Sequence, residues 1–107
     1  MKYYLTILII LISYITASAQ SKVSGKIIDE QSKNPIEYVN IALIQADTVF
    51  RNGTITDENG FFEFHNITPG EYSLCATFIG YDESRTLITN SDKDLDIGEI
   101  HMKAGDV

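Results

Sequence analysis

The chain has 107 residues, of which 44% are hydrophobic, and its formal net charge is −7 at pH 7. This length suits one small domain, and the acidic balance argues against nucleic acids and anionic lipid surfaces as partners, because like charges repel. The single cysteine, Cys75, can form no internal disulfide. We therefore expect the hydrophobic core to supply the stability of the domain.

The first 19 residues have the pattern of a secretory signal peptide. Lys2 supplies a positive charge, residues 5–12 are almost wholly apolar, and Ala17-Ser18-Ala19 forms a small-x-small cleavage site. A membrane anchor would need about 20 apolar residues, whereas this stretch is shorter and is followed by polar side chains. We therefore expect cleavage after Ala19, export of the chain, and no transmembrane segment in the mature protein.

The remaining sequence predicts an all-β domain over residues 20–103, with residues 104–107 as the start of a linker or a C-terminal tail. Short runs in which apolar and polar residues alternate recur between turn signals, which is the pattern of half-buried strands. Seven strands are expected, at residues 21–29, 38–45, 49–56, 61–64, 71–78, 83–89 and 95–102. Seven short strands with turns about 8–12 residues apart favour a β-sandwich over an α/β fold.

The last predicted strand contains a break in its alternation. Leu95 and Ile97 share one parity, whereas Ile100 and Met102 share the other, and Gly98 lies between the two pairs. One extra residue in a strand reverses the side-chain alternation beyond it. We therefore expect a β-bulge at Gly98 that returns all four side chains to the core face.

Two turn signals, Asn59-Gly60 and Pro69-Gly70, enclose the most aromatic stretch of the chain. The first turn is expected to fold residues 54–56 back against residues 62–64, and the second to reverse the chain before the fifth strand. Aromatic side chains bury large areas, which a small domain without disulfides needs. The core side chains expected here are Phe62, Phe64, Ile67, Tyr72, Leu74 and Phe78. Of these, Phe62, Leu74 and Phe78 should be more deeply buried than Phe50.

The connection between the fifth and sixth predicted strands is short and contains Gly80-Tyr81. Gly80 has no Cβ, so we expect it to take a backbone conformation that is costly for other residues. Tyr81 is then carried over the end of the sandwich, with its ring on the core and its hydroxyl at a polar rim. An alternative stays open, in which Tyr81 is an exposed platform for stacking a ligand.

An ordered set of residues along the chain carries a family resemblance. The set comprises Gly25, Asp29, Pro35, Val39-Asn40-Ile41, Gly53-Thr54, Thr56-Asp57, Gly60-Phe61-Phe62, Ile67, Pro69-Gly70-Glu71-Tyr72 and Gly80-Tyr81. On these residues the sequence resembles the carboxypeptidase regulatory-like domain, and the resemblance covers residues 21–102. It implies a transthyretin-like (prealbumin-like) fold, which is a seven-stranded Greek-key β-sandwich.

A signal peptide followed directly by this domain is similar to the N-terminus of TonB-dependent outer-membrane receptors and related outer-membrane β-barrel proteins. The resemblance implies a non-catalytic accessory domain in the periplasm, at the periplasmic face of the outer membrane. Its partner would be the plug and barrel of a longer parent chain, or a separate outer-membrane or periplasmic protein. Because the sequence reaches Val107 without plug or barrel strands, a second hypothesis stays open. In that hypothesis the chain is a free-standing exported module that binds or adheres to a glycan or a protein.

Neither histidine belongs to a recognisable catalytic arrangement. His65 and His101 have no H-x-x-E or H-E-x-x-H spacing, and both are expected at the surface, His65 in a turn. The strand that contains Cys75 has no basic residue to activate the thiol, so Cys75 is interpreted as a small, inert sheet residue. We therefore expect no enzyme, no catalytic residues and no bound cofactor.

Two groups of acidic residues raise the question of a calcium site. Asp57 and Glu58 lie in one turn, and Asp92, Asp94 and Asp96 alternate along a later segment. Calcium requires six to eight converging oxygen ligands, and the first group lacks the spacing of an EF-hand loop. We interpret both groups as turn and surface residues, and no metal site is expected.

Overall fold

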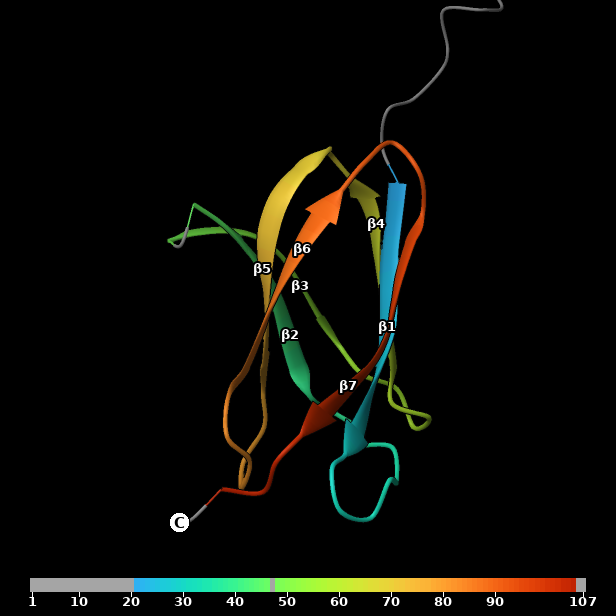
Figure 1. Ribbon diagram of the computed structural model, residues 1–107, viewed down its shortest axis with the longest axis vertical. Helices are drawn as coiled ribbons and strands as arrows, with labels where there is room; N and C mark the ends of the chain where they lie inside the picture. Colours follow the sequence, from blue (N-terminus) through green and yellow to red (C-terminus); the bar gives the residue numbers. More distant parts are fainter. Residues whose placement is uncertain (1–20, 47, 106–107) are drawn as a thin grey trace, which may run out of the picture.

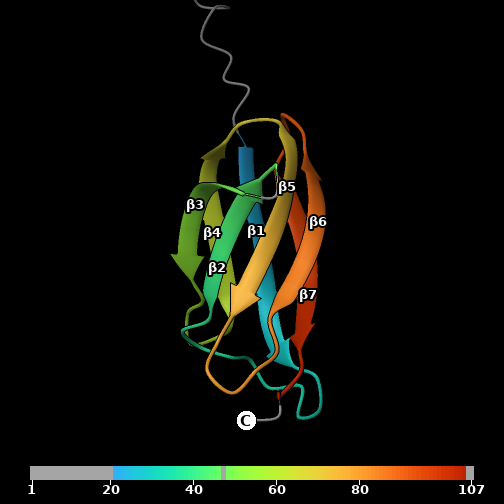
Figure 2. The ribbon, with the colours of Figure 1, turned by 90° about the vertical axis from the view of Figure 1, so that its left-hand side faces the viewer.

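Residues 21–46 and 48–105, which a computed structural model of the chain describes, form a two-layer β-sandwich (Figures 1 and 2). Within them are the strands β1 (Ser21–Asp29), β2 (Asn40–Gln45), β3 (Val49–Ile55), β4 (Phe61–Ile67), β5 (Gly70–Thr77), β6 (Ser84–Asn90) and β7 (Leu95–Met102). One sheet has the order β4-β1-β7 and the other the order β3-β2-β5-β6. The predicted all-β sandwich of seven strands is confirmed.

The predicted signal peptide, residues 1–19, lies outside the residues that the structure describes. Across the described ranges, no helix is long and apolar enough to cross a membrane.

The chain changes sheet between β1 and β2, between β3 and β4, between β4 and β5, and between β6 and β7. In the smaller sheet, β1 is central, antiparallel to β4 and parallel to β7. The chain folds back at Asn59-Gly60 as predicted, but residues 54–56 do not pair with residues 62–64, because β3 and β4 belong to opposite layers. The Asn59-Gly60 turn joins the two layers instead, so that β4 covers the core from the side opposite β3.

The turn between the layers is held by a side chain as well as by the backbone. Gly60 N–H donates to Asp57 O over 2.9 Å, and Gly60 has a φ of 77°. Asp57 Oδ1 accepts the N–H groups of Asn59 and Phe61 at 2.9 and 3.0 Å. A short acidic side chain that accepts local N–H groups is a common means of stabilising such turns.

β4 extends three residues beyond its predicted end, and His65 therefore lies in a strand rather than in a turn. The register against β1 shifts between Phe64 and Ile67, and Asn66 has a φ of 59°. This bulge adds one residue to β4, which returns Ile67 to the buried face after Phe64. The sequence prediction stopped at Phe64 because simple alternation fails at that point.

The bulge predicted at Gly98 is confirmed. The register of β7 against β1 gains one residue around Gly98, whose φ is 77°. Beyond it Ile100 and Met102 are buried, and before it Leu95 and Ile97 are half-buried against the core. The bulge therefore brings all four side chains to one face of β7, as expected from their parity.

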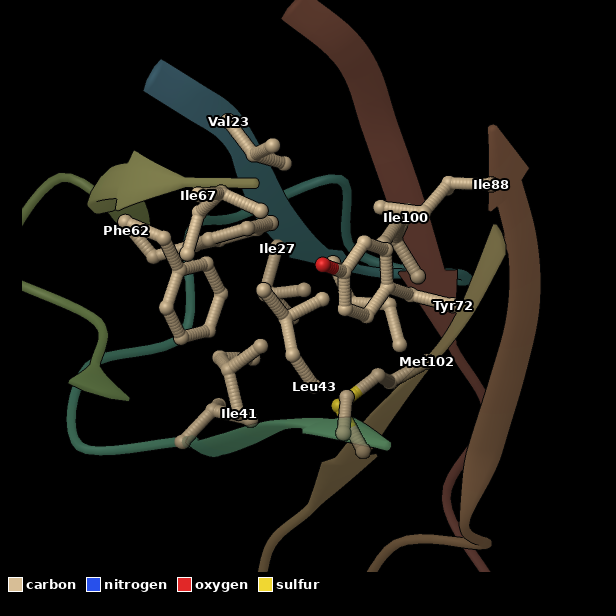
Figure 3. Packing of buried hydrophobic residues seen from close by; sticks show 14 of the residues in the cluster. Val23, Ile27, Ile41, Leu43, Phe62, Ile67, Tyr72, Ile88, Ile100 and Met102 are labelled. Carbon is tan, nitrogen blue, oxygen red and sulfur yellow. The ribbon is translucent and has the colours of Figure 1, made fainter. Parts of the chain in front are cut away.

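The core lies between the two sheets, where their inward side chains meet (Figure 3). It consists of Val23, Ile27, Ile36, Val39, Ile41, Leu43, Phe62, Phe64, Ile67, Tyr72, Leu74, Ala76, Ile88, Ile100 and Met102. Phe62 is 3% exposed and Leu74 fully buried, and Phe78 is half-buried, whereas Phe50 is 65% exposed. The predicted order of burial is confirmed.

Candidate functional site

The outer face of the three-stranded sheet is dominated by charged side chains. Lys22 Nζ lies 3.7 Å from Glu63 Oε1, and His65 Nε2 lies 3.2 Å from Glu63 Oε2. Lys26 Nζ lies 5.1 Å from the centre of the Phe61 ring, a cation–π contact. This face presents ion pairs to solvent, and polar side chains are usual on the solvent-exposed face of a sheet.

The outer face of the four-stranded sheet, which faces the viewer in Figure 2, has a different character. Strand register aligns its outward residues in three rows, of which the first two cross β3, β2, β5 and β6 in turn and the third crosses β3, β2 and β5. The first row is Phe50, Ile44, Ser73 and Leu87; the second is Gly53, Ala42, Cys75 and Arg85; the third is Ile55, Asn40 and Thr77. Four of these eleven outward positions therefore hold large apolar side chains, which are Phe50, Ile44, Leu87 and Ile55.

The side chains of the second row rise little above the sheet, because three of its residues are small. Gly53, Ala42 and Cys75 lie between the first and third rows, and the depression above them has a volume of about 650 Å³. We call this depression the cross-strand trough. It is bordered by Phe50, Ile44, Ile55, Asn40, Thr77 and Glu83.

Two of the residues that border the trough are exposed apolar side chains, Phe50 at 65% and Ile55 at 55%. Leu87 lies outside the trough, at the far end of the first row, and is 85% exposed. The Phe50 ring leans over Gly53, since a Cβ at Gly53 would lie 3.2 Å from Phe50 Cζ. Glycine at this position therefore leaves room for the ring to lie flat against the strand.

Cys75 is a buried sheet residue, as predicted, and it lies in the floor of the trough. Its cross-strand neighbour is Arg85 of β6, a basic residue that the sequence of β5 alone does not reveal. The Arg85 guanidinium is directed to another partner, since its Nε donates to Glu83 Oε1 over 3.2 Å.

At one end of the sandwich, Tyr81 packs as predicted. Its ring centre lies 6.0 Å from that of Phe78, and the side chain is half-buried against the core. The hydroxyl donates to Asp29 Oδ2 over 2.7 Å, which joins the β5–β6 connection to the end of β1. The packing interpretation of Tyr81 is therefore confirmed, and the sequence did not predict Asp29 as the hydroxyl's partner.

The hydrogen bond between Tyr81 and Asp29 changes the acidity of both groups. The backbone N–H of Ser32 and the Tyr81 hydroxyl both donate to the Asp29 carboxylate, and they lower its pKa. The hydrogen bond to Asp29 raises the pKa of Tyr81, because a neighbouring carboxylate disfavours the phenolate. The pair is thus held as a neutral phenol and an ionised carboxylate, which suits a structural contact.

Gly80, before Tyr81, takes a backbone conformation that is costly for other residues, as predicted, with a φ of 86°. A Cβ at this position would meet no atom within 4 Å, so the requirement for glycine concerns the backbone conformation rather than space. Gly80 O also accepts the N–H of Gly105 over 2.9 Å, and Asp82 N–H donates to Lys103 O over the same distance. The segment after β7 therefore lies alongside the β5–β6 connection.

We predict that truncating Tyr81 to alanine costs far more stability than removing its hydroxyl. Tyr81→Ala loses the ring contact with Phe78 and should lower the free energy of unfolding by about 2 kcal/mol. Tyr81→Phe keeps the ring and loses only the hydrogen bond to Asp29, so its effect should be clearly smaller. Urea denaturation of the two variants measures the difference, and equal losses would contradict a packing role for the ring.

The histidines and the acidic groups do not converge. His65 in β4 and His101 in β7 are both exposed, and each lies beside a glutamate of its own strand. Asp94 Oδ1 accepts the N–H of Lys22, and Asp96 Oδ1 accepts that of Gly98, both over 2.9 Å. In the described part of the chain, no cluster of three or more His, Cys, Asp or Glu residues is placed to hold a metal ion.

The fold and the residues that close its ends can be compared with known proteins. The family model for the carboxypeptidase regulatory-like domain matches residues 22–103. The chain belongs to this family. The resemblance seen in the sequence is thereby confirmed, and the carboxypeptidase regulatory-like domain accounts for the whole of the sandwich from β1 to β7. No curated protein matches the sequence.

Solved structures similar to this carboxypeptidase regulatory-like domain include proteins of bacterial surface assemblies. The backbone protein of the group B streptococcus pilus 2b has a TM-score of 0.63 and 14% identity, over 80% of this chain and 42% of its own. BcpA, the major pilin subunit of Bacillus cereus, has a TM-score of 0.64 and 15% identity, over 80% and 30%.

A chain of a type II Cohesin-X-Dockerin complex from Acetivibrio cellulolyticus has a TM-score of 0.66 and 23% identity, over 81% of this chain and 60% of its own. The chain thus spans less than two thirds of the length of each of these structures. At such identities the similarity shows the β-sandwich fold alone.

Proposed function

We propose that this chain is a non-catalytic accessory domain of a TonB-dependent outer-membrane receptor or a related outer-membrane β-barrel protein, exported to the periplasm. The pattern of residues 1–19 supports export. Membership of the carboxypeptidase regulatory-like family supports an accessory role, because this arrangement of signal peptide and domain is similar to the N-terminus of such receptors. In this role the domain binds a protein rather than converting a substrate.

One observation carries the proposal, which is the difference between the two outer faces of the sandwich. Both outer faces carry ion pairs, but the larger sheet exposes the three large apolar side chains Phe50, Ile55 and Leu87, whereas the smaller sheet exposes Phe61. Several large apolar residues at solvent-facing positions of one sheet are typical of surfaces that contact another protein. An accessory domain needs such a surface in order to hold its place beside a plug, a barrel or a separate protein.

A second candidate function is a free-standing exported binding or adhesion module for a glycan or a protein. The observation that favours it is the set of similar structures, which includes two pilus proteins and a cohesin–dockerin complex. The same apolar face would then contact a partner at the cell surface.

The coding sequence downstream of Val107 separates the two candidates. Continuation into a plug and amphipathic barrel strands supports the accessory domain, and a stop codon supports the free-standing module. Both candidates require export of the chain, which fractionation of the native cells tests. The chain should be absent from the cytoplasm, and a cytoplasmic chain would contradict both.

Processing provides a separate prediction, which concerns residues outside the described ranges. We predict that the exported protein begins at Gln20, because Ala17-Ser18-Ala19 has the small residues that signal peptidase requires. Intact-mass measurement of the protein purified from the periplasmic fraction determines the first residue. A mass that includes residues 1–19 would overturn this assignment.

A further inference from the structure

We propose that the cross-strand trough binds a peptide segment of another protein that presents a bulky apolar side chain beside a lysine or arginine. This inference rests on the proposed function, in that it names the site and the chemistry by which an accessory domain would contact its partner.

The shape of the trough fits inserted side chains. The first and third rows are four residues apart along β2, which is about 13 Å at ~3.3 Å per residue. Between them the floor residues Gly53, Ala42 and Cys75 rise little above the backbone. Phe50 and Ile55 border the depression on β3, both more than half exposed, so an apolar side chain that enters it gains contacts on two sides.

The charge of the trough favours a lysine or arginine beside the inserted apolar side chain of the partner. Among the residues that line it, Glu83 is the charged one. Its carboxylate pairs with Arg85, but both side chains are exposed and such pairs are weak, so a cation of the partner can share the carboxylate. The whole chain carries a charge of −7, which adds a longer-range attraction for basic segments.

The same charge disfavours a second copy of this chain as the occupant. A face-to-face dimer would bring together two chains that each carry a net charge of −7, whereas a basic segment gains from the field that opposes the dimer. The trough also crosses the open face of the sheet rather than following an edge. The occupant therefore inserts side chains from above and does not add a strand to the sheet.

The test uses random 12-residue peptides displayed on phage and selected on the mature chain, residues 20–107. The enriched peptides should carry a bulky apolar residue next to lysine or arginine. Ala42→Tyr fills the floor of the trough and should weaken their binding at least about tenfold, since it removes the space for the inserted side chain. Ser24→Tyr, at a half-buried outward position of the other sheet, should leave binding unchanged.

Two more variants, each with a control on the opposite face, keep the test decisive. If Ala42→Tyr does not fold, Phe50→Ser removes a wall residue that is 65% exposed, and Phe61→Ser is its control on the opposite face. Glu83→Gln should weaken binding of the basic peptides about two- to fivefold, the effect of one exposed charge pair. Glu99→Gln, on the other outer face, should have no effect.

The inference is overturned by any of three results. These are enriched peptides that lack the apolar and basic pair, peptides that bind the trough-filled variant as tightly as the wild type, and a dimer in sedimentation that Ala42→Tyr dissociates. Fractionation of the native cells reports separately on the proposed function. If the chain is exported but the selected peptides do not bind in the trough, this site is disproved and the accessory role is unaffected. A cytoplasmic chain would disprove the accessory role itself.

Discussion

Replacing Phe62 by alanine is expected to lower the free energy of unfolding by about 3–5 kcal/mol. Phe62 is 3% exposed, and its ring meets that of Phe64 edge-on, with ring centres 6.1 Å apart. The substitution removes a buried ring and leaves a cavity that the rigid sheets cannot close. For a small domain with a total stability of about 5–10 kcal/mol, the loss is a large fraction. The urea denaturation midpoint measures it.

The neighbouring phenylalanine provides a matched control. Phe61 precedes Phe62 in β4 but points outward and is 50% exposed, with Lys26 over its ring. Phe61→Ala should therefore cost about 1 kcal/mol or less, since it removes an exposed contact and creates no cavity. If the two alanine variants unfold at the same urea concentration, the inward assignment of Phe62 is wrong.

The second large effect is expected at Gly60, in the turn that joins the two layers. Gly60 and Gly98 share a φ of 77°, so alanine meets the same backbone strain at both, about 1–2 kcal/mol. At Gly60 the added Cβ would also lie 2.5 Å from Ile27 O, whereas at Gly98 it would meet no atom within 4 Å. We expect a cost of about 2–5 kcal/mol for Gly60→Ala, the sum of strain and overlap, and the smaller cost for Gly98→Ala.

The comparison of these two glycines isolates the close approach of the turn to β1. Ile27 N–H donates to Gly60 O over 2.8 Å, so a shift of the turn also disturbs this hydrogen bond. Thermal or urea denaturation of both variants provides the measurement. Equal destabilisation would mean that backbone strain alone accounts for Gly60, and that the layers tolerate movement of the turn.

The strands could be predicted from the sequence because side-chain alternation is a local property. Tyr72, Leu74 and Ala76 reveal the inward face of β5 from spacing alone, and the bulge at Gly98 follows from a change of parity within eight residues. The bulge of β4 escaped prediction, since no second apolar pair follows Phe64 to reveal the shift.

Pairing between distant segments could not be predicted in the same way. The choice of β1 as the partner of β4, and the contact between Asp29 and Tyr81 across 52 positions, depend on how the whole chain closes. The cross-strand trough also depends on pairing between distant segments, because Gly53, Ala42 and Cys75 become neighbours only through the strand register. A signal was nevertheless present in the sequence, since Phe50, Ile55 and Leu87 are apolar residues at outward positions of the strands.

The most direct test of the account is photo-crosslinking in the native cells from two exposed positions on opposite faces. A benzophenone amino acid replaces Leu87, which is 85% exposed on the four-stranded sheet, or Phe61, which is 50% exposed on the charged face. We expect a crosslink from position 87 to an outer-membrane β-barrel protein and none to that protein from position 61. No adduct from position 87, or the same adduct from both positions, would contradict the claim that this domain binds its partner through the apolar face.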